Sequence, residues 1–386
     1  MFRRLAKKVL LAVPDVRRVI DERDAATERA ADLEAQVNLQ TQIVADHAAQ
    51  LRALRQELDT AEAAQAPMKV GRMLPRPAEP ETAWEKLELP GGYRDAFRAV
   101  MMDTFYRDNP LIDISNSEVF ERDLAAHTEH RFRVFEQWIA TWLHLAAPDM
   151  SQMTAIEVGS GTGSSTLAFA RKVKRLISFE IDTKATAAAK ARLSAFGLNH
   201  VEFHDGQFDA TSPVARSGNQ ADLIVLCAVL EHMTHQERTN TLKTAWSTLR
   251  SGGLLVVADT PNRFAVFDDH TSLLPYYSAL PTWLQDEYSR YSPRADFRNS
   301  ISKTSPTNMP EVLARWGAGI SYHDFELALG QSIHEYVVLD GYEPSLLGMY
   351  PDRIDDGLMR IAFDHYEIPA HRAFTRSLLH FALKKP

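Results

Sequence analysis

The sequence predicts an α/β fold. A doubly wound, mostly parallel sheet with an antiparallel strand at its C-terminal end follows a long N-terminal helix or coiled coil. Three observations predict it: apolar runs alternate with helical segments after residue 150, a glycine-rich turn follows the first run, and a heptad pattern occupies the N-terminal region. The expected strands are Ala155–Val158, Leu176–Ile181, Val201–Phe203, Leu223–Ala228 and Leu254–Ala258, with Ile320–Leu327 and Ser377–Leu383 as further candidates.

Residues 1–66 are expected to form a basic amphipathic start and a coiled-coil helix. The apolar stretch at the start is short and is followed by Pro14 and charged residues, which is not the pattern of a cleaved signal peptide. From Val19 to Ala61 there is no proline or glycine, and apolar positions recur at heptad spacing. Arg23, Gln40 and His47 weaken that seam. We therefore expect a homodimer through the coiled coil, with a single solvated helix as the alternative.

The rest of the chain is expected to be a linker and one globular domain. Residues 67–92 hold several prolines and glycines, which break helices, and predict the linker. Residues 93–386 form the domain. Its helical N-terminal part, 93–150, has amphipathic helices near Tyr93–Phe105 and Phe120–Leu145. The aromatic segment 262–310 is longer than an ordinary connection and predicts a lid-like insertion.

Composition narrows the classes of partner. The net charge of −8 lacks the basic excess of a nucleic-acid binder, so no nucleic acid is expected. The single cysteine, Cys227, fits a cytoplasmic setting, and no apolar run is long enough to span a bilayer. The basic N-terminus leaves open a peripheral contact at the inner face of the membrane. No metal is expected, because the 14 histidines show no recognisable ligand spacing.

The strongest motif is the turn from Glu157 to Gly163, which follows an apolar strand. Glycines at alternate positions allow a sharp bend and a close approach by a ligand. A nicotinamide dinucleotide would require glycine where Ser164 stands, and its pyrophosphate would lie near Glu157, which should repel it. A sulfonium amino acid fits better, because its ammonium can approach Glu157 while its carboxylate faces the start of the next helix. Glu180 follows Gly159 by 21 residues, a separation suited to an acid that binds ribose hydroxyls.

These elements, with Leu230-Glu231-His232 after the fourth strand and Gly252–Arg263 around the fifth, resemble a class I S-adenosylmethionine-dependent methyltransferase of the ubiquinone-biosynthesis type. The resemblance covers residues 150–263 and implies a Rossmann-like sheet with S-adenosylmethionine as cofactor. The family usually holds the adenine with an acid after the third strand, where this chain has Gln207 and, two residues earlier, Asp205. The contacts expected for the cofactor are Glu157, Gly159, Ser160, Gly161, Gly163, Glu180, Ile181, Asp205, Gly206, Gln207, Cys227 and Ala228.

Methyl transfer from a sulfonium needs alignment and exclusion of water, and a hydroxyl acceptor also needs a base. His232 is the first candidate for that base and His270 the second, while the alternative for His232 is an anchor for the following helix. Arg263, Asp269 and His270 in the aromatic insertion are the expected acceptor contacts. A small-molecule, glycan or lipid-linked acceptor is expected. The competing functions are a catalytically silent coiled-coil scaffold and a nicotinamide-dependent oxidoreductase, whereas a metal-dependent hydrolase is disfavoured.

Overall fold

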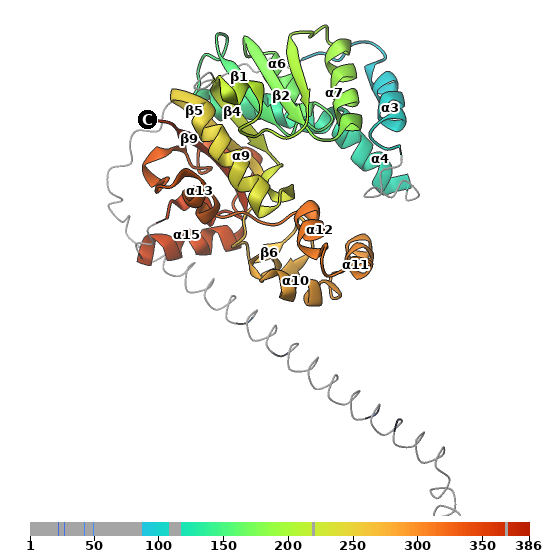
Figure 1. The fold of residues 1–386 in the computed structure, drawn as a ribbon, viewed down its shortest axis with the longest axis vertical. Helices are drawn as coiled ribbons and strands as arrows, with labels where there is room; N and C mark the ends of the chain where they lie inside the picture. Colours follow the sequence, from blue (N-terminus) through green and yellow to red (C-terminus); the bar gives the residue numbers. More distant parts are fainter. Residues whose placement is uncertain are drawn as a thin grey trace, which may run out of the picture. The chain divides into compact units, whose positions relative to one another are not determined.

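A computed structural model describes residues 87–107, 117–217, 221–366 and 370–386, together with the single positions Glu22, Thr27, Gln42 and Ala49. The chain divides into two units, residues 1–78 and 79–386. The predicted amphipathic start, coiled coil and most of the predicted linker lie outside the described residues. The coloured ribbon in Figure 1 is almost entirely the second unit, which carries the sheet.

The second unit is built on a seven-stranded sheet of order β3-β2-β1-β4-β5-β9-β8. Strands β1 to β5 are parallel, and β9 runs antiparallel between β5 and β8. This arrangement confirms the predicted fold class. The strands are β1 (Thr154–Val158), β2 (Arg175–Glu180), β3 (Val201–Asp205), β4 (Ala221–Cys227), β5 (Leu249–Pro261), β8 (Val337–Leu339) and β9 (Leu378–Lys384).

Helices cover both faces of the sheet because its central strands are apolar on both sides. Leu223 and Val225 of β4 join a core with α5 (Arg131–Thr141) and α6 (Ser164–Ala170). Ile224 and Leu226 point the other way into a core with α9 (His235–Thr248) and α13 (Tyr322–Leu329). In Figure 1, α6 and α7 (Thr183–Ala195) lie on the opposite side of the sheet from α9 and α13.

The helical part before the sheet agrees with the predicted amphipathic helices. α3 (Tyr93–Asp103) buries Tyr93, Phe97 and Met101, and α4 (Ser117–Ala125) adds Phe120 to the same cluster. Between α4 and α5 the chain forms a π-helical turn, η1 (Ala126–His130). Single π-turns occur often at functional sites. The stretch ends in a 3-10 turn, η2 (Leu143–Leu145).

The expected strand Ile320–Leu327 is wrong, because this segment is largely the helix α13. Ser321 and Asp324 form a capping box that satisfies the first backbone donors of the helix. Phe325 and Ala328, three residues apart, then face the core. The short edge strand β8 was not predicted, since three residues are too few to show a period.

The segment after β5 has its own hydrophobic core, in which Tyr277, Phe297 and Leu313 are buried. Its two ends are adjacent, since Arg263 N donates to Ile320 O and Ile320 N donates to Pro261 O. The insertion is therefore longer than predicted and returns at Ile320. Its elements are β6 (Phe267–Asp268), β7 (Leu274–Pro275), η4 (Tyr277–Ala279), α10 (Thr282–Ser289), α11 (Ala295–Ser302) and α12 (Met309–Trp316).

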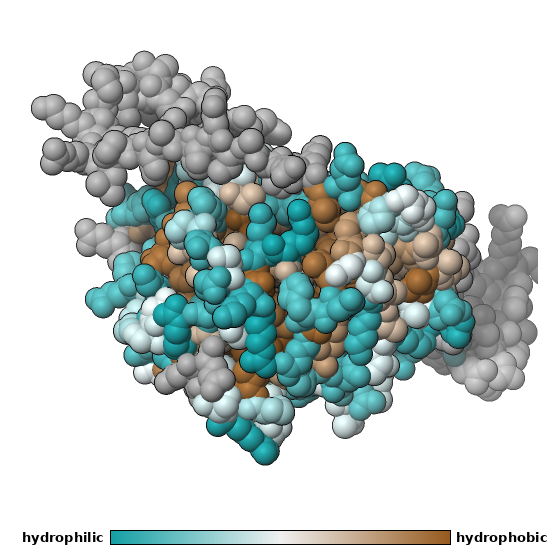
Figure 2. Space-filling model, turned by 90° about the horizontal axis from the view of Figure 1, so that it is seen from above, coloured by the Kyte–Doolittle hydropathy of each residue, from teal (hydrophilic) through white to brown (hydrophobic). Residues whose placement is uncertain are grey.

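The remaining helices and turns lie between the strands of the sheet. They are α8 (Pro213–Arg216), η3 (Leu230–His232), η5 (His334–Tyr336), α14 (Pro344–Met349), α15 (Ile354–Tyr366) and η6 (Arg372–Thr375). In the face shown in Figure 2, hydrophobic residues are visible between hydrophilic ones over the middle of the view. Among the described residues, no helix has the length and apolar character that crossing a bilayer requires.

Candidate active site

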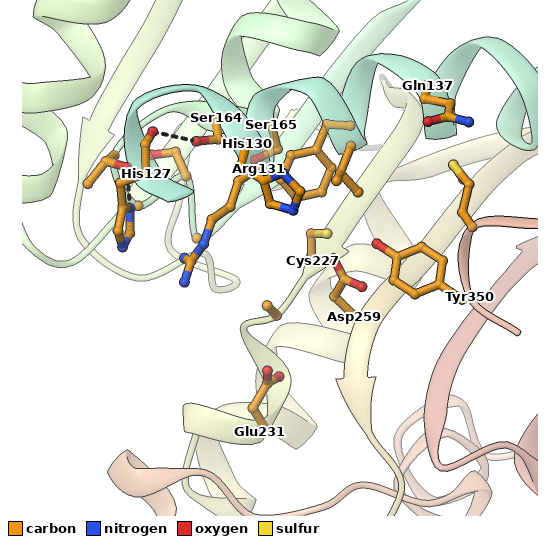
Figure 3. Close-up of a pocket in the computed structure, with 18 of the residues that line it drawn as sticks. His127, His130, Arg131, Gln137, Ser164, Ser165, Cys227, Glu231, Asp259 and Tyr350 are labelled. Carbon is orange, nitrogen blue, oxygen red and sulfur yellow. Dashed lines mark hydrogen bonds between the residues drawn. The ribbon is translucent and has the colours of Figure 1, made fainter. Parts of the chain in front are cut away.

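The candidate site lies at the carboxyl ends of β1 and β4, where the strand order reverses and open α/β sheets bind ligands. Two hollows meet there. The larger, here called the chamber, has a volume of about 910 Å³ and is shown in Figure 3. The smaller, here called the side pocket, has a volume of about 230 Å³ and lies beside Glu180 and Gln207. Gly159, Gly161, Ala228 and His232 line both hollows.

The glycine turn between β1 and α6 forms the wall shared by the two hollows. Gly159, Gly161 and Gly163 all have positive φ angles, which side chains disfavour. A Cβ at Gly159 would lie 2.5 Å from Val229 Cγ2, and one at Gly163 would lie 2.8 Å from Ala189 Cα. A Cβ at Gly161 would meet no protein atom within 4 Å. Two of the glycines therefore allow packing, and Gly161 leaves room for a ligand.

Glu157 faces the start of α6 instead of either hollow. Its carboxylate accepts hydrogen bonds from Ser165 Oγ at 2.5 Å and Thr166 Oγ1 at 2.7 Å. Complete burial raises its pKa to about 7. Glu157 thus fixes the first turn of α6, and its oxygens are not turned towards the chamber as the ammonium contact would require.

Glu180 at the end of β2 lines the side pocket and supports the glycine turn. It accepts hydrogen bonds from Gly161 N at 2.7 Å and from Ile181 N at 2.8 Å. Ile181, Gly206 and Gln207 line the same pocket. The Gln207 amide donates to Glu237 Oε1 at 2.8 Å, whereas Asp205 is exposed and outside the lining.

A buried arginine ties the glycine turn to η1 across the chamber wall. Arg192 of α7 donates to Thr162 O at 2.9 Å and to Thr128 O at 3.0 Å, and it also bonds to His127 O. Burial lowers its pKa to about 10, so it stays charged at neutral pH. His127 Nδ1 lies 2.9 Å from Thr162 Oγ1, which adds a second link. These contacts hold His127, His130 and Arg131 at the chamber, where Figure 3 shows them.

Glu231, His232 and His270 form a polar cluster at another wall of the chamber. His232 Nδ1 lies 3.0 Å from Arg315 O, so this nitrogen carries the proton and Nε2 keeps a free lone pair. His270 Nδ1 bonds Thr271 Oγ1, whose hydroxyl donates to Gly317 O, so its Nε2 is free as well. The two Nε2 atoms lie 3.9 Å and 4.0 Å from Glu231 Oε1.

This cluster is uncharged near neutral pH. Burial, and then the Asp259 carboxylate, raise the pKa of Glu231 to about 8. Burial lowers the pKa of His232, and burial followed by the charge of His232 lowers the pKa of His270 to about 4. Within the described part of the chain, neither oxygen of the fully buried Glu231 carboxyl has a hydrogen-bond partner. A ligand in the chamber would supply one.

The same three side chains have the geometry to hold a metal ion. Their candidate ligand atoms all lie within 4.8 Å of one another. One carboxylate and two neutral imidazoles form a common set for a divalent cation. Sequence spacing does not show this grouping, because His270 comes from the insertion. The expectation of a site without metal stays a prediction.

Asp259, Tyr350 and His380 form a second polar group, which sequence reasoning did not single out. His380 Nε2 lies 3.0 Å from Asp259 Oδ1, and the Tyr350 hydroxyl also hydrogen-bonds that carboxylate. Figure 3 shows Asp259 and Tyr350 close to Cys227 at the chamber. Burial raises the pKa of the Cys227 thiol, so this sulfur is not a nucleophile here.

The three residues predicted to contact the acceptor do not lie together in the structure. His270 lines the chamber, but Arg263 and Asp269 do not. Asp269 is exposed and accepts a hydrogen bond from Arg353 Nη1 at 2.7 Å. Ser160, Cys227 and Ala228 line the chamber as expected contacts of a ligand, whereas Gly163 lies outside both linings.

The sheet order, the glycine turn and the acid at the end of β2 define a class I methyltransferase domain. Residues 155–253 match the family model described as a methyltransferase domain. This segment is therefore a methyltransferase domain, and S-adenosylmethionine is its methyl donor.

A curated human protein is similar over part of the chain. It is tRNA (uracil-5-)-methyltransferase homolog A from Homo sapiens, which is 31% identical over 127 residues. The alignment covers 30% of this chain and 20% of the human protein, so this chain spans about a fifth of that relative.

Two solved structures overlay in part. The YcgJ protein from Bacillus subtilis has a TM-score of 0.35 and 12% identity, covering 66% of this chain and 96% of that one. Phosphoethanolamine N-methyltransferase 1 from Haemonchus contortus has a TM-score of 0.30 and 15% identity, covering 44% of this chain and 32% of that one.

Replacing Gly161 or Gly163 by alanine should distinguish a glycine that leaves room for a ligand from one that allows close packing of the protein. Gly163→Ala places a methyl group against the Ala189 backbone and should lower the unfolding temperature strongly. Gly161→Ala meets no protein atom, so it should cost only about 1 kcal/mol of backbone strain while weakening binding of S-adenosylhomocysteine. Thermal unfolding and calorimetric titration measure the two effects. Equal loss of stability in both variants would contradict this division.

Replacing Glu231 by glutamine should make stability less dependent on pH. The folded protein keeps a proton on Glu231 up to about pH 8, whereas the unfolded chain releases it near the ordinary pKa of 4.5. The contribution of Glu231 to stability therefore falls as pH rises between these values. The difference in unfolding temperature between Glu231→Gln and the wild type should therefore shift by several degrees in favour of the variant as the pH is raised from the lower to the higher value. Glu202→Gln is the control, and parallel curves for Glu231→Gln and wild type would refute the assignment.

Proposed function

We propose that the chain transfers a methyl group from S-adenosylmethionine to a hydroxyl oxygen of an acceptor bound in the chamber. The observation that carries this proposal is the cluster of Glu231, His232 and His270, which presents neutral imidazole lone pairs beside the glycine turn. A hydroxyl must lose its proton when it is methylated, and a neutral imidazole can accept it.

In this proposal the cofactor extends across both hollows. Its adenosine lies in the side pocket. There the Glu180 carboxylate accepts hydrogen bonds from the ribose hydroxyls, and Gln207 lies near the adenine. Its methionine part passes Gly161 into the chamber. Arg131, which is exposed at the chamber, binds the cofactor carboxylate.

The reaction is an in-line displacement. The acceptor oxygen forms a bond to the methyl carbon as the carbon–sulfur bond breaks, which releases S-adenosylhomocysteine. The acceptor proton passes to His232 Nε2. Glu231 Oε1 lies 3.9 Å from that nitrogen. His270 is the second base in reach of the same space.

The proposed acceptor is a small molecule, a sugar or a lipid-linked compound. The name of the human relative mentions tRNA, but the net charge of −8 does not suit a polyanionic acceptor. The ubiquinone-biosynthesis type, the homodimer through residues 1–66 and a peripheral membrane contact remain part of the proposal. The heptad pattern and the basic start support the last two.

Cofactor binding tests the proposal directly. Glu180→Gln should weaken binding of S-adenosylhomocysteine by roughly ten- to a hundredfold, because hydrogen bonds to a charged group are lost. Asp205→Asn is the matched control, since Asp205 is exposed and outside the side pocket. Calorimetric titration measures both affinities. If the wild type binds no S-adenosylhomocysteine, the silent scaffold becomes the better description, and preference for a reduced nicotinamide cofactor would favour the oxidoreductase.

His232→Ala should lower turnover by about a hundred- to ten-thousandfold while cofactor binding persists. Turnover is measured as release of S-adenosylhomocysteine with an acceptor found among phenols and sugars. Addition of EDTA should leave the wild-type rate unchanged, because a neutral imidazole needs no metal. If the turnover of His232→Ala equals that of the wild type, His232 is not the base. A rate lost with EDTA and restored by Mg²⁺ assigns Glu231, His232 and His270 to a cation instead.

A further inference from the structure

Asp259 is turned towards the chamber by an irregularity in β5. The register of β5 against β9 shifts between Val257 and Thr260, and Asp259 lies within that shift with a φ of 49°. A bulge of this kind redirects a side chain, and a non-glycine residue with a left-handed backbone angle is strained. Such strain is retained where the surrounding structure fixes it, often at a functional site.

The carboxylate of Asp259 is kept ionised although it is largely enclosed. Burial alone would raise its pKa, but the hydrogen bond and charge of His380 and the hydrogen bond of Tyr350 bring it below the ordinary value. His380 is completely buried, and its ring lies 4.5 Å from that of Tyr350. Tyr350 keeps its proton, since burial and Asp259 raise the pKa of its hydroxyl. Two groups thus hold the carboxylate in place, and 26% of its side chain stays exposed.

Asp259 and the base cluster occupy neighbouring strand ends. Ala258 of β5 pairs with Cys227 of β4, and Glu231 follows β4 in η3. Asp259 and Glu231 both line the chamber, so oxygen acceptors from β5 and from η3 reach the same space. Their surroundings differ, because Asp259 Oδ1 lies 3.0 Å from His380 Nε2, whereas neither Glu231 carboxyl oxygen has a hydrogen-bond partner in the described part of the chain.

The chamber favours hydroxyl donors over a cationic acceptor. In the proposed complex the cofactor carboxylate pairs with Arg131, so the sulfonium supplies the positive charge that faces the acceptor. An ammonium group beside the methyl donor would be repelled, whereas a hydroxyl donates to Asp259 without adding charge.

We propose that Asp259, supported by His380 and Tyr350, binds a hydroxyl adjacent to the one that is methylated, and that the acceptor is a sugar with neighbouring hydroxyls. The proposal rests on the methyl-transfer function and names its substrate class. Asp259 is a specificity-determining residue, and His380 and Tyr350 are positioning residues.

The test uses the full chain saturated with S-adenosylhomocysteine. Methyl glycosides of mannose, galactose and rhamnose are titrated as probes, with binding followed by saturation-transfer NMR. Cyclohexanol, 2-aminocyclohexanol and catechol are the comparison probes. At least one glycoside should bind more tightly than each of the three comparison probes. Asp259→Asn should weaken the affinity for that glycoside at least tenfold. Asp149→Asn, in the exposed loop before β1 at the opposite edge of the sheet, should leave its affinity unchanged.

Each other outcome overturns the inference. Asp259 does not select a sugar if no glycoside binds to the wild type. The same holds if Asp259→Asn binds a glycoside as tightly as the wild type does. A preference for 2-aminocyclohexanol would assign a cationic acceptor, and a preference for catechol an aromatic one. The proposed function fails separately, because its failure appears as loss of S-adenosylhomocysteine binding in the wild type before any probe is added.

Discussion

The site depends on the buried guanidinium of Arg192. It bonds to the glycine turn through Thr162 O and to η1 through the carbonyls of His127 and Thr128. Hydrogen bonds from a charged donor stabilise by about 1.5–3 kcal/mol each, and an unpaired buried charge is costly. The glycine turn and η1 are therefore held in one arrangement by a residue outside the chamber lining.

Among the described residues, two of the four non-glycine residues with left-handed backbone angles lie on neighbouring strands at the chamber, and the other two are Leu273 and Tyr276 in the insertion. Ala228 after β4 and Asp259 in β5 both have left-handed backbone angles without being glycine, and both line the chamber. The flanking strands are paired and buried on both faces, so they can hold such conformations. A rigid sheet thus presents irregular backbone where a ligand is expected.

The sequence predicts the sheet well because its strands are continuous apolar runs, and it predicts the glycine turn because the backbone conformation requires glycine there. It also predicts Glu180, His232 and His270 as site residues, and these line the two hollows. It does not reveal that Glu157 turns to α6, since the choice between Ser165 and a ligand depends on side-chain direction. Asp259, Tyr350 and His380 come from distant segments, so no local spacing signals their association. The helix α13 was missed because its apolar residues also fit a short strand.

The insertion between Asn262 and Ile320 has a consequence for how this enzyme can diversify. It leaves and rejoins the domain at one point, where two backbone hydrogen bonds close its ends, and it folds around its own core. Segments of this kind can be exchanged or lengthened with little effect on the host domain. The glycine turn and Glu180 lie outside it, whereas His270 lies within it. If the proposed site is correct, exchange of this insertion would alter which acceptor is methylated and leave the binding of the methyl donor unchanged.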